Sequence, residues 1–126
     1  MNIEVGEYVR TFNGEIAKII GTDIEFDCKV YKTDQYIQSS RDFYVFENDS
    51  GIVNHSKNII DLIEVGDFVN GHKVRAVYLK GTTHYIKLDF ENEKGKRFYN
   101  EDVKSIVTKE QFSKMEYIVW VKKKKQ

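Results

Sequence analysis

The 126-residue sequence contains no proline and a single cysteine, Cys28. One cysteine cannot form an internal disulfide, which excludes a disulfide-stabilised scaffold and favours a reducing compartment. No apolar run approaches the roughly 20 residues that span a bilayer, and no basic N-terminal region precedes an apolar core. We therefore expect no membrane span and no signal peptide, and we predict a cytoplasmic protein.

Motifs for catalysis and metal binding are missing as well. The cysteine and the histidines, at positions 28, 55, 72 and 84, are scattered and lack the paired short spacings of a zinc site. The sequence has no serine-nucleophile elbow, zinc-protease motif, phosphate-binding loop or dinucleotide fingerprint. We predict a protein that is not an enzyme and that uses no metal and no cofactor.

Positively charged residues are scarce in the first half of the chain. Residues 1–62 hold six Lys/Arg against eleven Asp/Glu, a net of −5, whereas residues 63–121 hold ten against nine, a net of +1. The segment Lys122–Lys125 adds four positive charges, which brings the whole chain to zero. Duplex-binding domains usually carry a concentrated basic face. In this chain only the second half and the tail have enough positive charge to supply one.

What the sequence does contain is a repeat. Ile3-Glu4-Val5-Gly6-Glu7-Tyr8-Val9 returns as Ile63-Glu64-Val65-Gly66-Asp67-Phe68-Val69, with Glu against Asp and Tyr against Phe as the two differences. Each copy is followed by Asn-Gly, at positions 13–14 and 70–71, which is the strongest short signal for a β-hairpin. The repeat predicts two structural units in series, residues 1–62 and 63–121.

Alternating runs of β-forming residues predict a mainly β fold with short strands. Residues 24–31 read as one strand, and the polar stretch 33–41 reads as a loop inserted in the first unit or as a distorted ribbon. Aligning residues 54–60 with 100–106 gives the first unit about fourteen extra residues, which we place around this loop. Thr108-Lys109-Glu110-Gln111 matches a capping box and predicts a short helix over 108–115. A final strand at 117–121 and a disordered basic tail at 122–126 complete the prediction.

A small five-stranded unit that opens with Val-Gly, an acid, an aromatic residue and Val resembles an SH3-like barrel. The same opening resembles the start of KOW and Tudor modules. The whole chain, especially residues 55–67 and 106–112, is similar to small uncharacterised proteins of phages and prophages of clostridia and related low-GC Gram-positive bacteria. The resemblance implies two tandem SH3-like units acting in a bacterial host cell. In that setting small proteins often bind and block host factors, such as a component of a CRISPR defence system.

Two sets of residues are candidates for binding. Around the predicted loop of the first unit, aromatic and apolar side chains interrupt a polar stretch and suit a protein partner: Tyr31, Tyr36, Ile37, Arg41 and Phe43. In the second unit and the tail, basic residues accompany Tyr85 and Tyr99 and suit a nucleic acid: Lys87, Lys94, Lys96, Arg97, Lys122, Lys123, Lys124 and Lys125.

Both sets also have simpler explanations. Strand alternation turns about half of the aromatic residues inward, lysines protect exposed strand edges, and a lysine tail keeps a protein soluble. Our leading hypothesis is a binding protein that engages a host protein through the first unit and inhibits a host defence system. The alternatives are a KOW- or Tudor-like nucleic-acid binder and a structural or assembly protein of the virion. No homo-oligomeric state is predicted.

Overall fold

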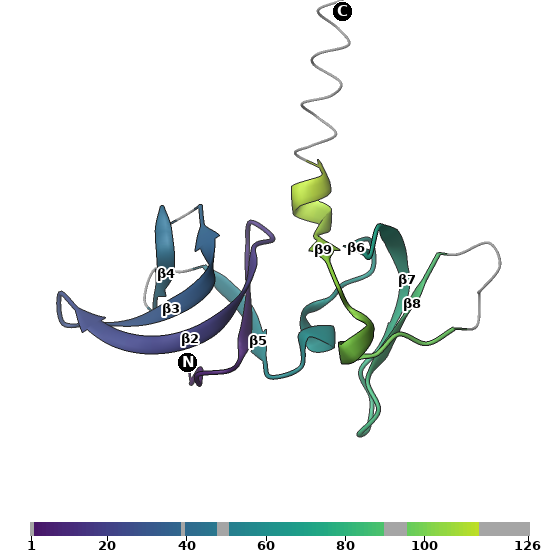
Figure 1. Ribbon diagram of the computed structural model, residues 1–126, viewed down its shortest axis with the longest axis horizontal. Helices are drawn as coiled ribbons and strands as arrows, with labels where there is room; N and C mark the ends of the chain where they lie inside the picture. Colours follow the sequence, from purple (N-terminus) through teal and green to yellow (C-terminus); the bar gives the residue numbers. More distant parts are fainter. Residues whose placement is uncertain (1, 39, 48–50, 90–95, 114–126) are drawn as a thin grey trace, which may run out of the picture. The chain divides into compact units, whose positions relative to one another are not determined.

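The computed structural model describes residues 2–38, 40–47, 51–89 and 96–113. The chain divides into two compact units, residues 1–62 and 63–126. Each unit is built on one antiparallel sheet, so the prediction of a mainly β fold is confirmed (Figure 1). The predicted final strand at 117–121 and the basic tail at 122–126 lie outside the described residues.

Unit 1 is a five-stranded antiparallel sheet with the order β4-β3-β2-β1-β5. Its strands are β1 (Tyr8–Thr11), β2 (Ile16–Glu25), β3 (Cys28–Ile37), β4 (Asp42–Phe46) and β5 (Ile52–Ser56). The 3₁₀ turn η1 (Ile59–Leu62) follows β5, and the Leu62 carbonyl accepts a 2.8 Å hydrogen bond from the buried Arg10 guanidinium. The core consists of inward-facing side chains of the sheet together with Ile3, among them Val9, Ile19, Tyr31, Ile37 and Val45.

Unit 2 has a smaller sheet with the order β8-β7-β6-β9. Its strands are β6 (Phe68–Val69), β7 (His72–Tyr78), β8 (Tyr85–Leu88) and β9 (Ile106–Val107), with the 3₁₀ turn η2 (Asn100–Asp102) before β9. Phe98 adds a single antiparallel bridge to Ile86 of β8. Residues 109–113 are helical. The Thr108 hydroxyl accepts from the Gln111 N–H, and the Gln111 side chain accepts from the Thr108 N–H, so the predicted capping box is confirmed.

The repeated heptapeptide forms the same turn in both units. In unit 1 the Glu7 N–H bonds the Glu4 carbonyl at 3.1 Å, and in unit 2 Asp67 N–H bonds the Glu64 carbonyl at the same distance. The glycine at the third turn position has φ 96° in the first copy and 100° in the second, which a type II turn requires and which glycine adopts without a Cβ clash. The motif is therefore a structural start signal for each sheet.

The Asn-Gly pairs also form the predicted hairpins. In unit 2 Asn70 and Gly71 both have positive φ, 52° and 82°, and join β6 to β7 by a two-residue turn. Positive φ at both positions is the type I′ geometry, whose twist matches that of the flanking strands. In unit 1 the turn between β1 and β2 is longer and closes with the Thr11 N–H on the Glu15 carbonyl at 2.9 Å.

Two predictions for unit 1 were wrong. Residues 24–31 are not one strand, because the chain reverses at Phe26 and Asp27 between β2 and β3. The stretch 33–41 is not a loop throughout, because residues up to Ile37 belong to β3, with irregular register toward β2 and β4, as in the distorted ribbon that was the alternative; the described residues after Ile37 form the turn to β4. Pairing of Thr33 with Ile19 of β2 and of Ile37 with Asp42 of β4 holds this polar stretch extended, a stabilisation that its own composition does not reveal.

The alignment of residues 54–60 with 100–106 was wrong as well. Tyr8 pairs with Ser56, and its counterpart Phe68 pairs with Val107, so Ser56 corresponds to Val107. The extra length of unit 1 lies largely in the hairpin of β2 and β3, which have ten residues each where β7 and β8 have seven and four.

Candidate binding surfaces

The five residues predicted around the loop of unit 1 separate into two groups. Tyr31 and Ile37 are fully buried in the core of unit 1, so they are not contact residues, and their prediction as binding residues was wrong. Tyr31 lies opposite Val45 on the neighbouring strand, where the alternation of β3 turns it inward.

Tyr36, Arg41 and Phe43 remain at the surface. Tyr36 and Phe43 are 53% and 54% exposed, and their rings meet edge to face with centroids 5.7 Å apart. Arg41 is exposed in the tight turn between β3 and β4, where its φ of 57° is unusual for a non-glycine residue. These three residues form the aromatic turn of unit 1.

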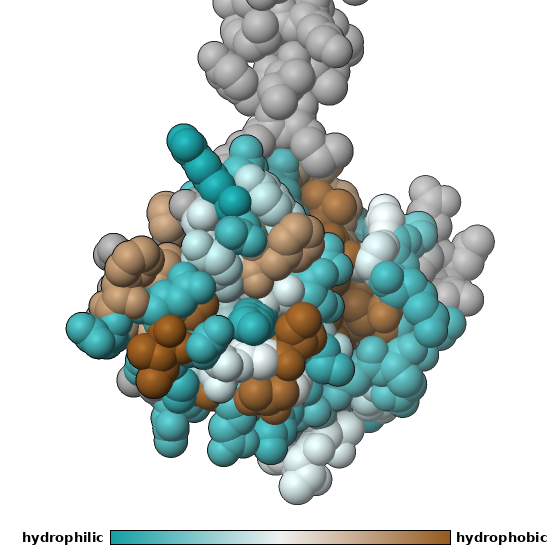
Figure 2. Space-filling model, turned by 60° about the vertical axis from the view of Figure 1, so that its left-hand side comes forward, coloured by the Kyte–Doolittle hydropathy of each residue, from teal (hydrophilic) through white to brown (hydrophobic). Residues whose placement is uncertain are grey.

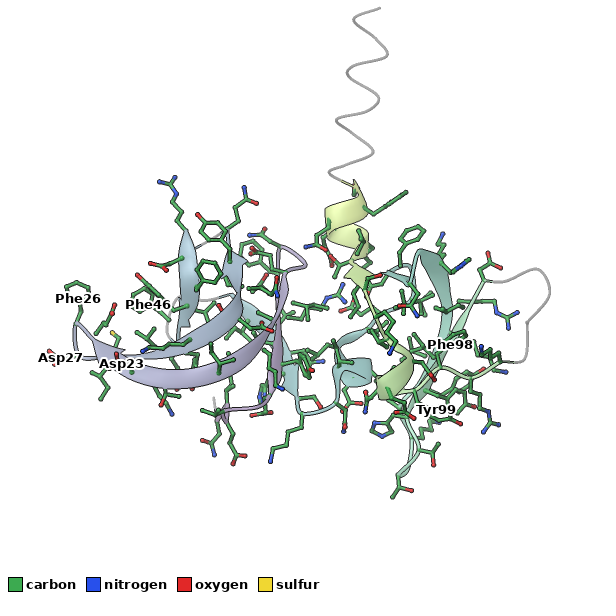
Figure 3. All side chains as sticks on the ribbon, viewed as in Figure 1. Asp23, Phe26, Asp27, Phe46, Phe98 and Tyr99 are labelled. Atoms are coloured by element: carbon green, nitrogen blue, oxygen red, sulfur yellow. The ribbon has the colours of Figure 1, made fainter. Side chains whose placement is uncertain are left out.

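A second exposed aromatic residue lies at the tip of the β2–β3 hairpin. The side chain of Phe26 is 90% exposed and extends outward at the end of the hairpin (Figure 3). Phe26 and Asp27 both have positive φ, 53° and 61°, so they form a two-residue turn without the glycine or asparagine that such a turn favours. A bulky residue in this region is strained by ~1–2 kcal/mol.

The sequence analysis missed Phe26 because the alternation of residues 24–31 runs straight through the turn. The one local signal is Asp27, since aspartate tolerates positive φ better than most residues. Ile24, beside the tip, is also largely exposed. Figure 2 shows brown apolar side chains separated by teal polar ones on this side of the molecule.

Carboxylates surround the tip of the hairpin. Asp23, Glu25 and Asp27 lie within three residues of Phe26, and Asp23, Asp27 and Glu47 line a shallow hollow beside it. Lys32 forms a 3.9 Å ion pair with Asp23, and Lys29 lies over the Tyr31 ring at 5.3 Å. Phe26 is therefore an exposed apolar group within a mainly acidic rim, which we call the acidic tip.

Unit 2 brings together most of the described residues of the predicted basic and aromatic set. The rings of Tyr78 and Tyr85 stack with centroids 4.7 Å apart and an interplanar angle of 24°. The ring centroid of Tyr99 lies 6.1 Å from that of Tyr85. The Arg97 guanidinium lies 4.5 Å from the centroid of Tyr85, and the Lys87 ammonium lies 5.7 Å from that of Tyr78. We call these five residues the tyrosine–arginine face.

The remaining basic candidates are placed differently. Lys96 lies over the Phe98 ring at 5.0 Å. Lys94 and Lys122, Lys123, Lys124 and Lys125 lie outside the described residues. Tyr78, which the sequence analysis did not select, is the residue that extends the stack. Its pairing with Tyr85 across β7 and β8 could have been inferred only from the strand register.

The acidic residue of each repeat has a structural task. The Glu7 carboxylate accepts from the Glu4 N–H and from His55 Nδ1, the latter at 2.9 Å. Burial raises the pKa of Glu7, but these hydrogen bonds and the charges of His55 and Lys57 outweigh it and hold the pKa below its usual 4.5. In unit 2 the buried Asp67 accepts at 2.8 Å from the Glu64 N–H and from the Lys109 N–H.

In the part of the chain that the structure describes, no group of three or more His, Cys, Asp or Glu side chains is arranged to hold a metal ion. Within the same residues, no helix has the length and apolar character needed to cross a membrane. Comparison of the chain with family models, with curated proteins and with solved structures found no match.

Proposed function

We propose that the protein is a non-enzymatic binding protein and that unit 1 engages a protein partner through the acidic tip and the aromatic turn. The observation that carries the proposal is Phe26, which is 90% exposed on a strained turn. Strain of this kind persists where function requires a particular side chain. A rigid aromatic residue is a common anchor of protein interfaces.

The charge around Phe26 indicates the kind of partner. Asp23, Glu25 and Asp27 flank the ring, and residues 1–62 carry a net charge of −5. A partner surface with an apolar pocket rimmed by lysine and arginine complements this arrangement. On the resemblance to phage proteins inferred from the sequence, we extend the proposal to a bacterial host factor. A nucleic-acid-binding defence component such as a CRISPR effector has the required basic surface.

We further propose that both units are variants of the SH3-like barrel. In its support, each sheet pairs the first strand of its unit with the last strand that the structure describes there, β1 with β5 and β6 with β9. The described sheets are open, since their order ends at β4 and β5 in unit 1 and at β8 and β9 in unit 2.

The proposed function is tested by affinity capture followed by binding to the purified partner. The immobilised full chain is incubated with bacterial host lysate, with and without nuclease, and the recovered protein is then purified and titrated against variants. We expect Phe26→Ala to weaken binding by at least about tenfold, as for an interface anchor. Binding should also weaken as salt rises, because the charges are exposed.

The matched control is Phe12→Ala, which removes another exposed phenylalanine of unit 1 and should leave the affinity unchanged. Phe43→Ala tests the aromatic turn in the same way. The proposal would be contradicted if nuclease abolished recovery of the partner protein. It would also be contradicted if neither Phe26→Ala nor Phe43→Ala changed the affinity for that partner.

A further inference from the structure

The tyrosine–arginine face of unit 2 belongs to the outer side of its sheet. Along β8 the buried residues Ile86 and Leu88 alternate with Tyr85 and Lys87, which are only half-buried. The core of unit 2 therefore packs on the side of β8 that carries Ile86 and Leu88. Core packing does not explain why aromatic rings and cations lie together on the other side. Phe98 forms an antiparallel bridge with Ile86 of β8 and is buried. Its sequence neighbours Arg97 and Tyr99 therefore lie on the outer side, where they join the face.

The face combines two kinds of group on neighbouring strands. Tyr78 and Tyr85 are direct partners across β7 and β8, and their rings stack with centroids 4.7 Å apart. Tyr78 is 43% exposed as a residue. Lys87 and Arg97 place positive charge within 6 Å of these rings. We propose that this face binds single-stranded nucleic acid, a ligand beyond the protein partner proposed for unit 1.

The chemistry of a single strand fits both groups. Unpaired bases stack on aromatic side chains whatever their sequence, because every base has a π-face. The phosphates between successive bases are attracted to arginine and lysine placed beside the rings. Tyr78 and Tyr85 provide the stacking surface, and Lys87 and Arg97 provide the phosphate contacts.

A duplex fits the face less well. Its bases are stacked on one another inside the helix, so the tyrosine rings cannot stack on them. Duplex affinity then rests on phosphate contacts alone, and the described part of the face offers only Lys87, Arg97 and the neighbouring Lys96 for these. We therefore expect a preference for single strands.

The test is fluorescence anisotropy of the full-length protein with labelled oligonucleotides: a 15-nucleotide oligo-dT, a 15-nucleotide oligo-rU and a 15-base-pair duplex. We expect both single strands to bind at least about tenfold more tightly than the duplex. Tyr78→Leu should weaken binding about 5- to 150-fold, the range found when one stacked base loses its ring, and Tyr78→Phe should bind like the wild type. Arg97→Ala should reduce the slope of log K against log salt by about 0.7, one phosphate contact.

Matched controls come from unit 1. Phe12→Leu removes an exposed aromatic ring and Lys57→Ala removes an exposed lysine, and neither should change the affinity. A melting curve for each variant separates loss of the face from loss of the fold, and Arg97→Ala, at an exposed position, tests the face without removing a ring.

Three results would each overturn the proposal: no binding to any of the oligonucleotides, equal affinity for strand and duplex, or full affinity in both Tyr78→Leu and Arg97→Ala. Replacement of Lys122–Lys125 by serine tests whether the lysine tail, rather than the face, binds the nucleic acid. If that replacement alone abolishes binding while the face variants bind normally, the tail and not the face holds the nucleic acid.

Discussion

At the tip of the β2–β3 hairpin, two residues hold a backbone conformation that their side chains disfavour. Phe26 and Asp27 have φ of 53° and 61°, whereas the two-residue turn between β6 and β7 of unit 2 uses Asn70 and Gly71. The second pair shows what the backbone itself prefers at a type I′ turn. The presence of phenylalanine at this position is therefore not explained by folding, and interaction with a partner is the physical reason that we propose for it.

The double variant Phe26→Asn/Asp27→Gly tests this conclusion. It should increase the free energy of unfolding by about 1–2 kcal/mol, because asparagine and glycine relieve the strain of two residues with positive φ. Thermal or denaturant unfolding followed by circular dichroism measures the change. The same variant should lose the protein partner, so that stability and binding move in opposite directions. A variant that is less stable than the wild type would show that Phe26 packs in the fold.

At the scale of single elements, the hairpin between β6 and β7 depends on one glycine. A Cβ on Gly71 would meet nothing within 4 Å, yet the φ of 82° is strained for any side chain. Gly71→Val should therefore destabilise the protein through the backbone alone, by about 1–2 kcal/mol. The control is Gly21→Ala, since Gly21 has ordinary φ and its Cβ would make an ordinary 3.6 Å contact with Lys32. A melting temperature unchanged by Gly71→Val would contradict the hairpin.

The turn that begins unit 1 should make stability depend on pH. The pKa of Glu7 is lower in the folded protein than its usual 4.5. A carboxyl with a lowered pKa contributes its full stabilisation above the unfolded-state value and loses it as pH falls through the folded-state value. Glu7→Gln should thus lower stability by roughly 0.5–1.5 kcal/mol at pH 7, and the difference from wild type should shrink as pH falls below about 4.5. Melting curves from pH 7 to pH 3 measure both. A constant difference over this range would exclude the ionised Glu7 as its cause.

At the scale of the whole molecule, the two units carry surfaces of different charge. Residues 1–62 have a net charge of −5 and present the acidic tip, and unit 2 presents the tyrosine–arginine face. If both proposals hold, the surfaces work independently. Phe26→Ala should keep its oligonucleotide affinity within about twofold, and Arg97→Ala should keep its affinity for the protein partner. Parallel titrations of the two variants against both ligands measure this. Loss of both ligands in one variant would indicate a shared site or a damaged fold.

Features that depend on neighbouring residues could be predicted from the sequence. The Ile-Glu-Val-Gly repeat, the Asn-Gly hairpins and the capping box at Thr108 each close through hydrogen bonds over a few positions. Of the binding residues, Tyr36, Arg41 and Phe43 are at the surface as expected, and Arg97 meets Tyr85. The amino-acid sequence alone determines the repeat turns, the Asn-Gly hairpins and the capping box, because their hydrogen bonds are local.

Only the tertiary structure decided which strand each residue pairs with and which side it faces. Tyr31 and Ile37 look like loop residues, but pairing of β3 on both edges buries them. Phe26 looks like a strand residue, but the β2–β3 register places the reversal there. Tyr78 meets Tyr85 because β7 pairs with β8. Burial and pairing are long-range interactions with free energies that outweigh local preference, and they place the strained phenylalanine at the tip and the tyrosines on one face.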